Sequence, residues 1–222
     1  MNNSTQQPVV ELKRSELILC CTAILAANFM NILDTTIIAV ALPSITGSLS
    51  ATPVQGTWIY TIYAVCMAVM LPLSGWITQR YGEARVFIFA VALFTLSSWW
   101  CGLAPSFDSL IALRAVQGIA AGLMMPLTQT LLLRVLPKSP SIAMSLWSMT
   151  AAVPPILGPI AGGVITDNFG WEWIFYINIL PGVMILPIAW RYLLPLGNPG
   201  KKIPVDGVGL VTLVLGVICL QL

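Results

Sequence analysis

The chain has 222 residues, of which 58% are hydrophobic and only 8% are charged, with ten Lys and Arg against eight Asp and Glu. Because soluble domains carry about 25% charged residues, this composition excludes a soluble globular protein and indicates an integral membrane protein. The lack of histidine excludes a Ser-His-Asp triad and a His-rich zinc site. The five cysteines lie in apolar stretches without CxxC spacing, so we expect no metal, no cofactor and no enzymatic activity.

A short polar tail covers residues 1–16, and six apolar stretches follow it, each close to or above the roughly 20 residues that cross a bilayer. They cover about residues 17–41, 54–77, 86–104, 110–136, 142–166 and 173–194. A linker over 195–206 leads to a seventh stretch, 207–222, which is shorter than a full span. The sequence therefore predicts an all-α membrane protein, with a six-helix bundle over 17–194 and a truncated seventh span.

Basic residues alternate between the connections of these stretches. Nine of the ten lie before the first stretch, or in or next to every second connection: Lys13, Arg14, Arg80, Arg85, Arg134, Lys138, Arg191, Lys201 and Lys202. Lys and Arg next to membrane spans stay on the cytoplasmic side. We therefore expect a multi-pass protein whose N-terminal tail and 195–206 linker are cytoplasmic.

Two ionisable residues, Asp34 and Arg114, lie well inside the first and fourth stretches. Each would cost at least about 2.5–3.5 kcal/mol at the bilayer centre, so each needs a partner or water. With a helical rise of about 1.5 Å per residue, both lie on the outer side of the middle of their spans, at depths compatible with contact. One interpretation is a structural ion pair that locks two helices together. The other makes Asp34 a proton acceptor whose protonation depends on whether Arg114, substrate or water faces it.

Polar and small residues continue from both charges along one helix face. Asn31 precedes Asp34 at helical spacing, and Gln117 and Ala121 follow Arg114 in the same way. We expect both stripes to face one aqueous cavity. The predicted substrate cavity is lined by Asn31, Thr35, Ile38, Gln117 and Ala121.

The fifth stretch contains PPILGPIAGG, with three prolines and three glycines in an otherwise apolar span. Within lipid such residues are tolerated where neighbouring helices satisfy freed backbone groups and approach closely. Gly158 and Gly162 form a GxxxG pair, as do Gly118 and Gly122 in the fourth stretch. Both pairs are predicted packing faces, and the prolines are expected to bend the fifth helix. The alternative is generic helix association, for which GxxxG alone is weak evidence, but the adjacent Gly-Pro and Gly-Gly pairs make the signal more specific.

Four stretches carry a family resemblance. GPIAGG resembles an antiporter motif of a fifth helix, with Pro154 in place of the motif's first glycine. RAVQGIAAG resembles a fourth-helix motif whose proton-linked arginine falls on Arg114. LDTTIIAVALP is similar to a first-helix motif whose aspartate falls on Asp34, with Ala39 replacing the usual asparagine. The fifth-helix motif residues are Gly158, Pro159, Gly162 and Gly163.

GWITQRYGEAR, between the second and third stretches, resembles a cytoplasmic loop motif of the same family. Two of its positions differ, because Gln79 replaces an acidic residue and Glu83 replaces a basic one. The alternative is a charged turn that simply follows the positive-inside rule. The retained motif residues are Gly75, Arg80, Gly82 and Arg85.

These stretches resemble the major facilitator superfamily, within it the drug/proton antiporters with fourteen spans, and especially their bacterial multidrug-resistance protein B branch. The resemblance implies two six-helix bundles, each built of inverted three-helix repeats. This chain would hold the N-terminal bundle only, so we expect it to be a fragment.

The resemblance also implies a proton-coupled multidrug efflux antiporter of the bacterial inner membrane, with Asp34 and Arg114 in proton coupling. The implied partners are lipophilic drugs, protons, membrane lipids, a periplasmic adaptor protein and an outer-membrane channel, with no nucleic acid. Two alternatives remain open. One is a major facilitator carrier for a single metabolite or siderophore, and the other is a membrane fragment that does not transport.

Overall fold

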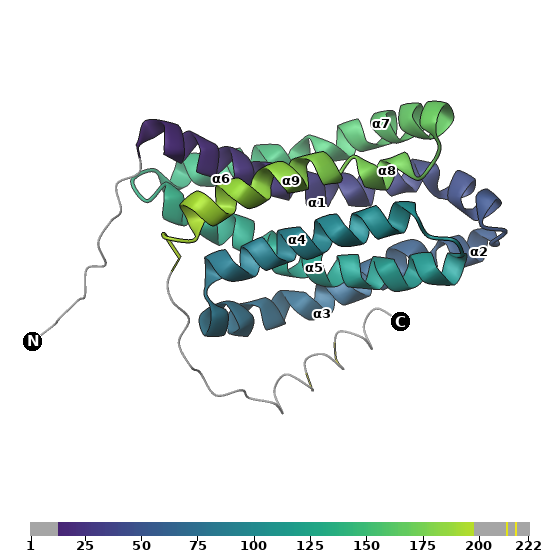
Figure 1. Cartoon of the computed structure of the whole chain (residues 1–222), viewed down its shortest axis with the longest axis horizontal. Coiled ribbons are helices and arrows are strands. Elements are labelled where there is room, and N and C mark those ends of the chain that lie inside the picture. The colour runs from purple at the N-terminus through teal and green to yellow at the C-terminus, as the bar shows by residue number, and fades with distance from the viewer. Residues whose placement is uncertain (1–12, 198–211, 213–215, 217–222) are drawn as a thin grey trace, which may run out of the picture.

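The computed structural model describes residues 13–197 and the single positions 212 and 216 (Figure 1). All regular elements in this described part of the chain are helices. In chain order they are α1 (Arg14–Ser48), α2 (Pro53–Gly56), α3 (Trp58–Tyr81), α4 (Glu83–Gly102), α5 (Phe107–Val135), α6 (Pro140–Ala152), α7 (Pro154–Phe169), α8 (Trp173–Tyr176), α9 (Ile179–Ile188) and the π-helical turn η1 (Ala189–Leu193).

These helices make six segments that are long and apolar enough to cross a membrane, which confirms the predicted all-α, six-span architecture. The segments are Arg14–Ser48, Pro53–Tyr81, Glu83–Gly102, Phe107–Val135, Pro140–Phe169 and Trp173–Leu193. The first begins before the expected residue 17 and continues seven residues past the expected residue 41, because a helix does not stop where its hydrophobic stretch does. The N-terminal tail before residue 13, most of the linker and all of the predicted seventh span except positions 212 and 216 lie outside the described residues.

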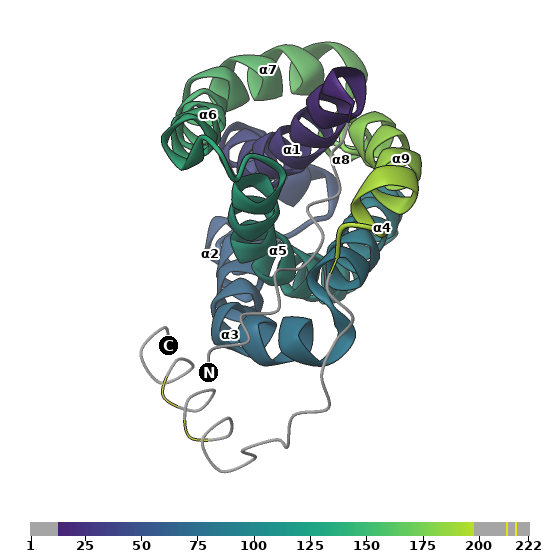
Figure 2. The same cartoon turned by 90° about the vertical axis from the view of Figure 1, so that its left-hand side faces the viewer.

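The helices run side by side along the long axis of the bundle, with α1 and α5 in the interior and α4 at the edge beside α9 (Figures 1 and 2). Helix α5 packs against α3 on one side and α4 on the other, whereas α1 packs against α7, α5 and α9. Helices α1, α4 and α5 contribute most of the buried residues, while α3, α6 and α7 contribute few.

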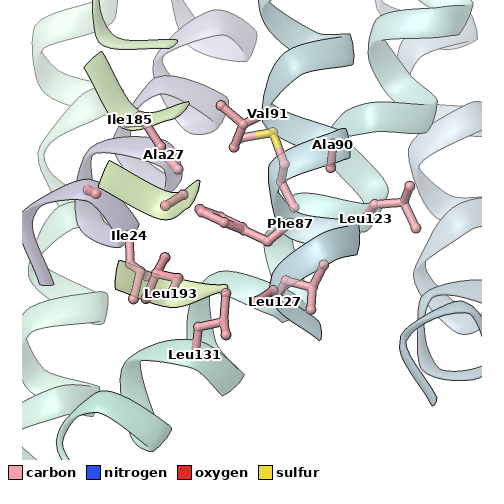
Figure 3. Packing of buried hydrophobic residues seen from close by; sticks show 14 of the residues in the cluster. Ile24, Ala27, Phe87, Ala90, Val91, Leu123, Leu127, Leu131, Ile185 and Leu193 are labelled. Atoms are coloured by element: carbon pink, nitrogen blue, oxygen red, sulfur yellow. The ribbon is translucent and has the colours of Figure 1, made fainter. Parts of the chain in front are cut away.

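Two apolar clusters fill the interior. The first apolar cluster lies where α1, α4, α5, α9 and η1 meet, and Figure 3 shows its Phe87 ring surrounded by aliphatic side chains. The second apolar cluster lies towards the opposite end of the bundle, where α8 and the α1–α2 and α4–α5 connections are found. It includes Ile37, Ile59, Leu110 and Phe175. Their burial removes apolar surface from water or lipid headgroups and packs the helices at interior density.

A polar layer separates the two clusters. On α1, Met30 belongs to the first cluster and Ile37 to the second, and Asp34 lies between them. On α5, Leu110 belongs to the second cluster and Ala120 to the first, with Arg114 and Gln117 between. The fold therefore carries its intramembrane charges to one level of the bundle.

Glycines let α5 approach α3 without side chains between them. A Cβ atom added to Gly118 would lie 2.5 Å from the backbone oxygen of Tyr63, and one added to Gly122 would lie 2.5 Å from that of Met67. These distances are shorter than van der Waals contact, so only glycine permits this packing. The GxxxG pair of the fourth span is therefore the contact face between α5 and α3.

The glycines of the fifth span act similarly against α1. A Cβ atom on Gly158 would overlap the side chain of Thr36, and one on Gly162 would lie 2.8 Å from the backbone oxygen of Ile37. Gly163 differs, because the nearest atom to its Cβ position is a Val40 methyl at 3.9 Å. Two of the three motif glycines thus lie in the helix contact and the third does not.

The fifth span is interrupted at Val153, between the end of α6 and the start of α7 at Pro154. Pro154 and Pro155 occupy the first turn of α7, where their missing N–H groups cost nothing because first-turn donors have no partner inside the helix. This interruption lies where the proline content predicts a bend.

We expect Gly162→Ala to destabilise the bundle and Gly163→Ala to leave it nearly unchanged. The added methyl group at position 162 must displace the α1 backbone, and overpacking of this kind costs about 1–3 kcal/mol, whereas position 163 has room. Denaturant unfolding of the purified protein in detergent measures both variants. Equal losses in the two variants would contradict the assigned contact.

Candidate functional site

The centre of the polar layer is an ion pair between Asp34 on α1 and Arg114 on α5. Arg114 Nη1 donates to Asp34 Oδ2 at 2.6 Å. Both side chains are fully buried, with relative exposures of 0%. A guanidinium and a carboxylate in contact and out of water form a charge-assisted hydrogen bond, which is about twice as strong as a neutral one.

Gln117 joins the two charges. Arg114 Nη1 also donates to Gln117 Oε1 at 2.6 Å, and Gln117 Nε2 donates to Asp34 Oδ1 at 3.0 Å. The same Nε2 group donates to Ser98 Oγ on α4 at 2.7 Å. An amide offers one acceptor and two donors, so Gln117 can bond both members of the pair at once.

The sixth span supplies a further donor to the carboxylate. Asn178, between α8 and α9, donates from Nδ2 to Asp34 Oδ1 at 3.0 Å and lies 3.5 Å from Ser98 Oγ. The Asp34 carboxylate therefore accepts hydrogen bonds from Arg114, Gln117 and Asn178. Sequence reasoning missed Ser98 and Asn178. The only signal for Asn178 is that it is an amide inside an apolar span, in the stretch WIFYIN.

Helix α3 covers the other side of Arg114. The Tyr63 ring centroid lies 4.1 Å from the Arg114 guanidinium carbon, which is within cation–π distance. Arg114 Nε donates to the Ile59 backbone oxygen at 3.4 Å. Among the described residues, Arg114 Nη2 has no hydrogen-bond partner. The Phe175 ring centroid lies 5.9 Å from the same guanidinium carbon. The charge of Arg114 is thus balanced by one carboxylate, two aromatic rings and backbone or amide oxygens.

Asn31 extends this network along α1. Tyr63 donates from its hydroxyl to Asn31 Oδ1 at 2.8 Å, and Asn31 Nδ2 donates to the Ala121 backbone oxygen at 3.2 Å. The polar stripe of α1 therefore meets α3 and α5 together.

The five residues predicted to line a substrate cavity lie in three different environments in the structure. Asn31 and Gln117 belong to the buried network, and Ile38 and Ala121 are fully buried among apolar neighbours. Thr35 is half-buried and donates to the Ile32 backbone oxygen. In this conformation the ion pair faces neighbouring side chains, because apolar clusters close it off on both sides and α3 covers Arg114. A substrate role for these five residues stays a prediction.

The loop motif lies around the connection between α3 and α4, at one end of the bundle, and none of its residues joins the ion-pair network in the described contacts (Figure 1). Gly82 joins α3 to α4 with a φ of 90°, a conformation that favours glycine. Arg80 lies over the Trp76 ring, with 5.5 Å from its guanidinium carbon to the ring centroid. Arg85 and Gly75 are exposed and touch none of these groups in the described contacts.

Glu83, the acidic substitution in the loop motif, has a partner at the end of α5. Arg134 Nη2 lies 3.0 Å from Glu83 Oε2, and Arg134 Nη1 donates to the Leu196 backbone oxygen at 3.5 Å. The departure from the family pattern is thus matched by a basic residue on a neighbouring helix. Among the described residues no cluster of His, Cys, Asp and Glu could hold a metal ion.

A buried acid and base joined across two spans, in a six-span bundle, is an arrangement that membrane transporters use. A family model described as Major Facilitator Superfamily matches residues 24–219. This chain belongs to the Major Facilitator Superfamily. The resemblance stated from the sequence motifs is confirmed.

Curated relatives share much of the sequence. The multidrug export protein EmrB of Haemophilus influenzae is 45% identical, over 100% of this chain and 44% of the relative. EmrB of Escherichia coli (strain K12) is 42% identical over 95% of this chain and 41% of its own length. The fatty acid resistance protein FarB of Neisseria gonorrhoeae is 44% identical over 88% of this chain and 39% of its own length. The chain thus spans less than half the length of these relatives.

Solved structures share the fold at low identity. A crystal structure of the peptide transporter POT in complex with alafosfalin matches with a TM-score of 0.70 and 13% identity, over 92% of this chain and 45% of that one. A bacterial homolog of the human lysosomal transporter Spinster, in an inward-facing and unoccupied conformation, matches with a TM-score of 0.62 and 19% identity. The match covers 89% of this chain and 47% of that one. These similarities support the six-helix fold of a major facilitator bundle.

We expect Arg114→Met to lower the free energy of unfolding by about 3–5 kcal/mol, because it leaves a buried carboxylate without its cation. Adding Asp34→Asn to this variant removes the remaining charge and restores part of the loss. The matched control is Arg134→Met, whose partner Glu83 is 22% exposed, and which we expect to cost about 1 kcal/mol or less. Denaturant unfolding in detergent provides the measurement. If Arg114→Met costs no more than Arg134→Met, the ion pair does not stabilise the bundle.

Proposed function

We propose that this chain is the N-terminal half of a proton-coupled multidrug efflux antiporter of the bacterial inner membrane. The observation that carries the proposal is the buried Asp34–Arg114 pair, which lies on the first and fourth spans of a major facilitator bundle. Ionisable residues inside membrane spans usually mark ion or proton pathways. The EmrB relatives are named multidrug export proteins, which supports drugs as the substrate class. We propose that these drugs are lipophilic.

In this mechanism Asp34 carries the transported proton and Arg114 responds to its charge. Ionised Asp34 attracts Arg114, and the bond between them holds α1 against α5. A proton arriving from the outer side neutralises Asp34, weakens this attraction and favours release of the drug and return to the inward-open state. Loss of the proton to the cytoplasm restores the pair. Transport is coupled because each step changes the relative stability of two conformations.

The basic residues between the spans support a cytoplasmic N-terminus by the positive-inside rule. The second bundle, the periplasmic adaptor protein and the outer-membrane channel are part of the proposed assembly. The FarB relative, named for fatty acid resistance, extends the proposed substrates to amphipathic molecules with a long apolar chain. A carrier for a single metabolite would instead transport one chemical class.

We expect Asp34→Asn in the full-length transporter to abolish dye efflux driven by a pH gradient, because an amide cannot carry the proton. Asp167→Asn is the matched control, since Asp167 is an exposed acid at the end of α7, and should retain efflux. Dye export from proteoliposomes with an imposed pH gradient measures both. Coupled efflux that persists in Asp34→Asn would remove Asp34 from the mechanism.

The substrate class needs its own test. Several chemically unrelated lipophilic dyes and a long-chain fatty acid are offered to the same proteoliposomes. Efflux of more than one class supports multidrug export, whereas efflux of a single class favours the metabolite-carrier alternative.

A further inference from the structure

The Asn178 side chain contacts the proposed proton-carrying group from a different part of the chain. It is 1% exposed, and its Nδ2 group donates to Asp34 Oδ1 at 3.0 Å. Gln117 donates to the same oxygen, but it lies on α5 together with Arg114, one helical turn away. Asn178 lies 144 positions from Asp34 along the chain. It is therefore the contact that connects the sixth span to the carboxylate.

The helix of the sixth span is interrupted at Asn178. Helix α8 ends at Tyr176 and α9 begins at Ile179, so Asn178 lies in the interruption between them. Its N–H donates to the Phe175 oxygen, three residues back, at 3.2 Å, and its own oxygen accepts from Gly182 N–H at 3.1 Å. Both helical pieces pack against α1 and α4, as Figures 1 and 2 show.

We propose that Asn178 is a positioning residue of the proton site, which stabilises ionised Asp34 and ties the sixth span to the charge state of Asp34. The inference rests on the proposed function, in which Asp34 carries the proton. A hydrogen bond to a carboxylate favours its charged form. When the carboxylate gains a proton, the bond from Asn178 loses its charge-assisted strength. Protonation thus loosens the sixth span from α1 as well as separating Asp34 from Arg114.

Replacing Asn178 removes none of the other ionisable groups that surround Asp34. Arg114 faces the carboxylate from α5, Tyr60 and Tyr63 lie within electrostatic reach on α3, and Cys101 does so on α4. The described parts of α8 and α9 contain no charged residue. A shift in the protonation of Asp34 on replacing Asn178 therefore reports the lost amide.

The test measures protonation of Asp34 separately from transport. A hydrophobic carbodiimide reacts with protonated carboxyl groups, and mass spectrometry of the peptide containing Asp34 gives the labelled fraction at each pH. In the full-length transporter, Asn178→Leu removes the donor, so the protonated form persists to higher pH. We expect the pH of half-maximal labelling to rise by about one unit.

Asn168→Leu is the matched control, because the Asn168 amide is exposed and, among the described residues, its side chain bonds only the Val164 backbone oxygen of its own helix. It should leave the labelling midpoint unchanged. If Asn178→Leu does not fold, the labelling midpoint of Asn178→Ser is measured instead, because the shorter serine side chain places its hydroxyl farther from Asp34. An unchanged midpoint in a folded Asn178 variant overturns the proposal. A raised midpoint supports it even if Asp34→Asn retains coupled efflux, a result that would overturn only the proton-coupling function.

Discussion

A carboxylate and a guanidinium held together out of water constrain every helix around them. Removing each ion from water costs several kcal/mol, and their attraction offsets this cost only when the remaining donors and acceptors are also met. Around Asp34 and Arg114 the partners come from α3, α4, α5 and the sixth span. The pair therefore specifies how four neighbouring elements are rotated and how deep they lie relative to α1.

The glycine faces and the ion pair are parts of one arrangement. Because Gly118 has no Cβ, the Tyr63 backbone can lie directly over α5, and this brings the Tyr63 ring to 4.1 Å from the Arg114 guanidinium. On the other side, Gly158 and Gly162 bring α7 against α1 immediately beyond Asp34. Close helix packing thus excludes water from the charges and strengthens every interaction between them.

In the proposed antiporter, this packing is what would differ between the two charge states of Asp34. With Asp34 ionised, α1, α5 and the sixth span are held by bonds to one carboxylate. Adding a single proton weakens all of them at once, because each bond depends on the same negative charge. A change at one atom can therefore alter the contacts of three spans, which is the kind of differential stability that alternating access requires.

The sequence alone determined that the chain is an all-α membrane protein with six spans, and that Asp34 and Arg114 lie at compatible depths. These follow from properties read along one dimension, namely the length of apolar runs and the cost of a charge in lipid. Only the tertiary structure decided that Ser98 and Asn178 join the pair, that Gln117 bridges it, and that Glu83 finds Arg134. Such contacts depend on how each helix is rotated about its axis and packed against its neighbours. The residues that they join are 19 to 144 positions apart, and the sequence carries no periodic signal of their pairing.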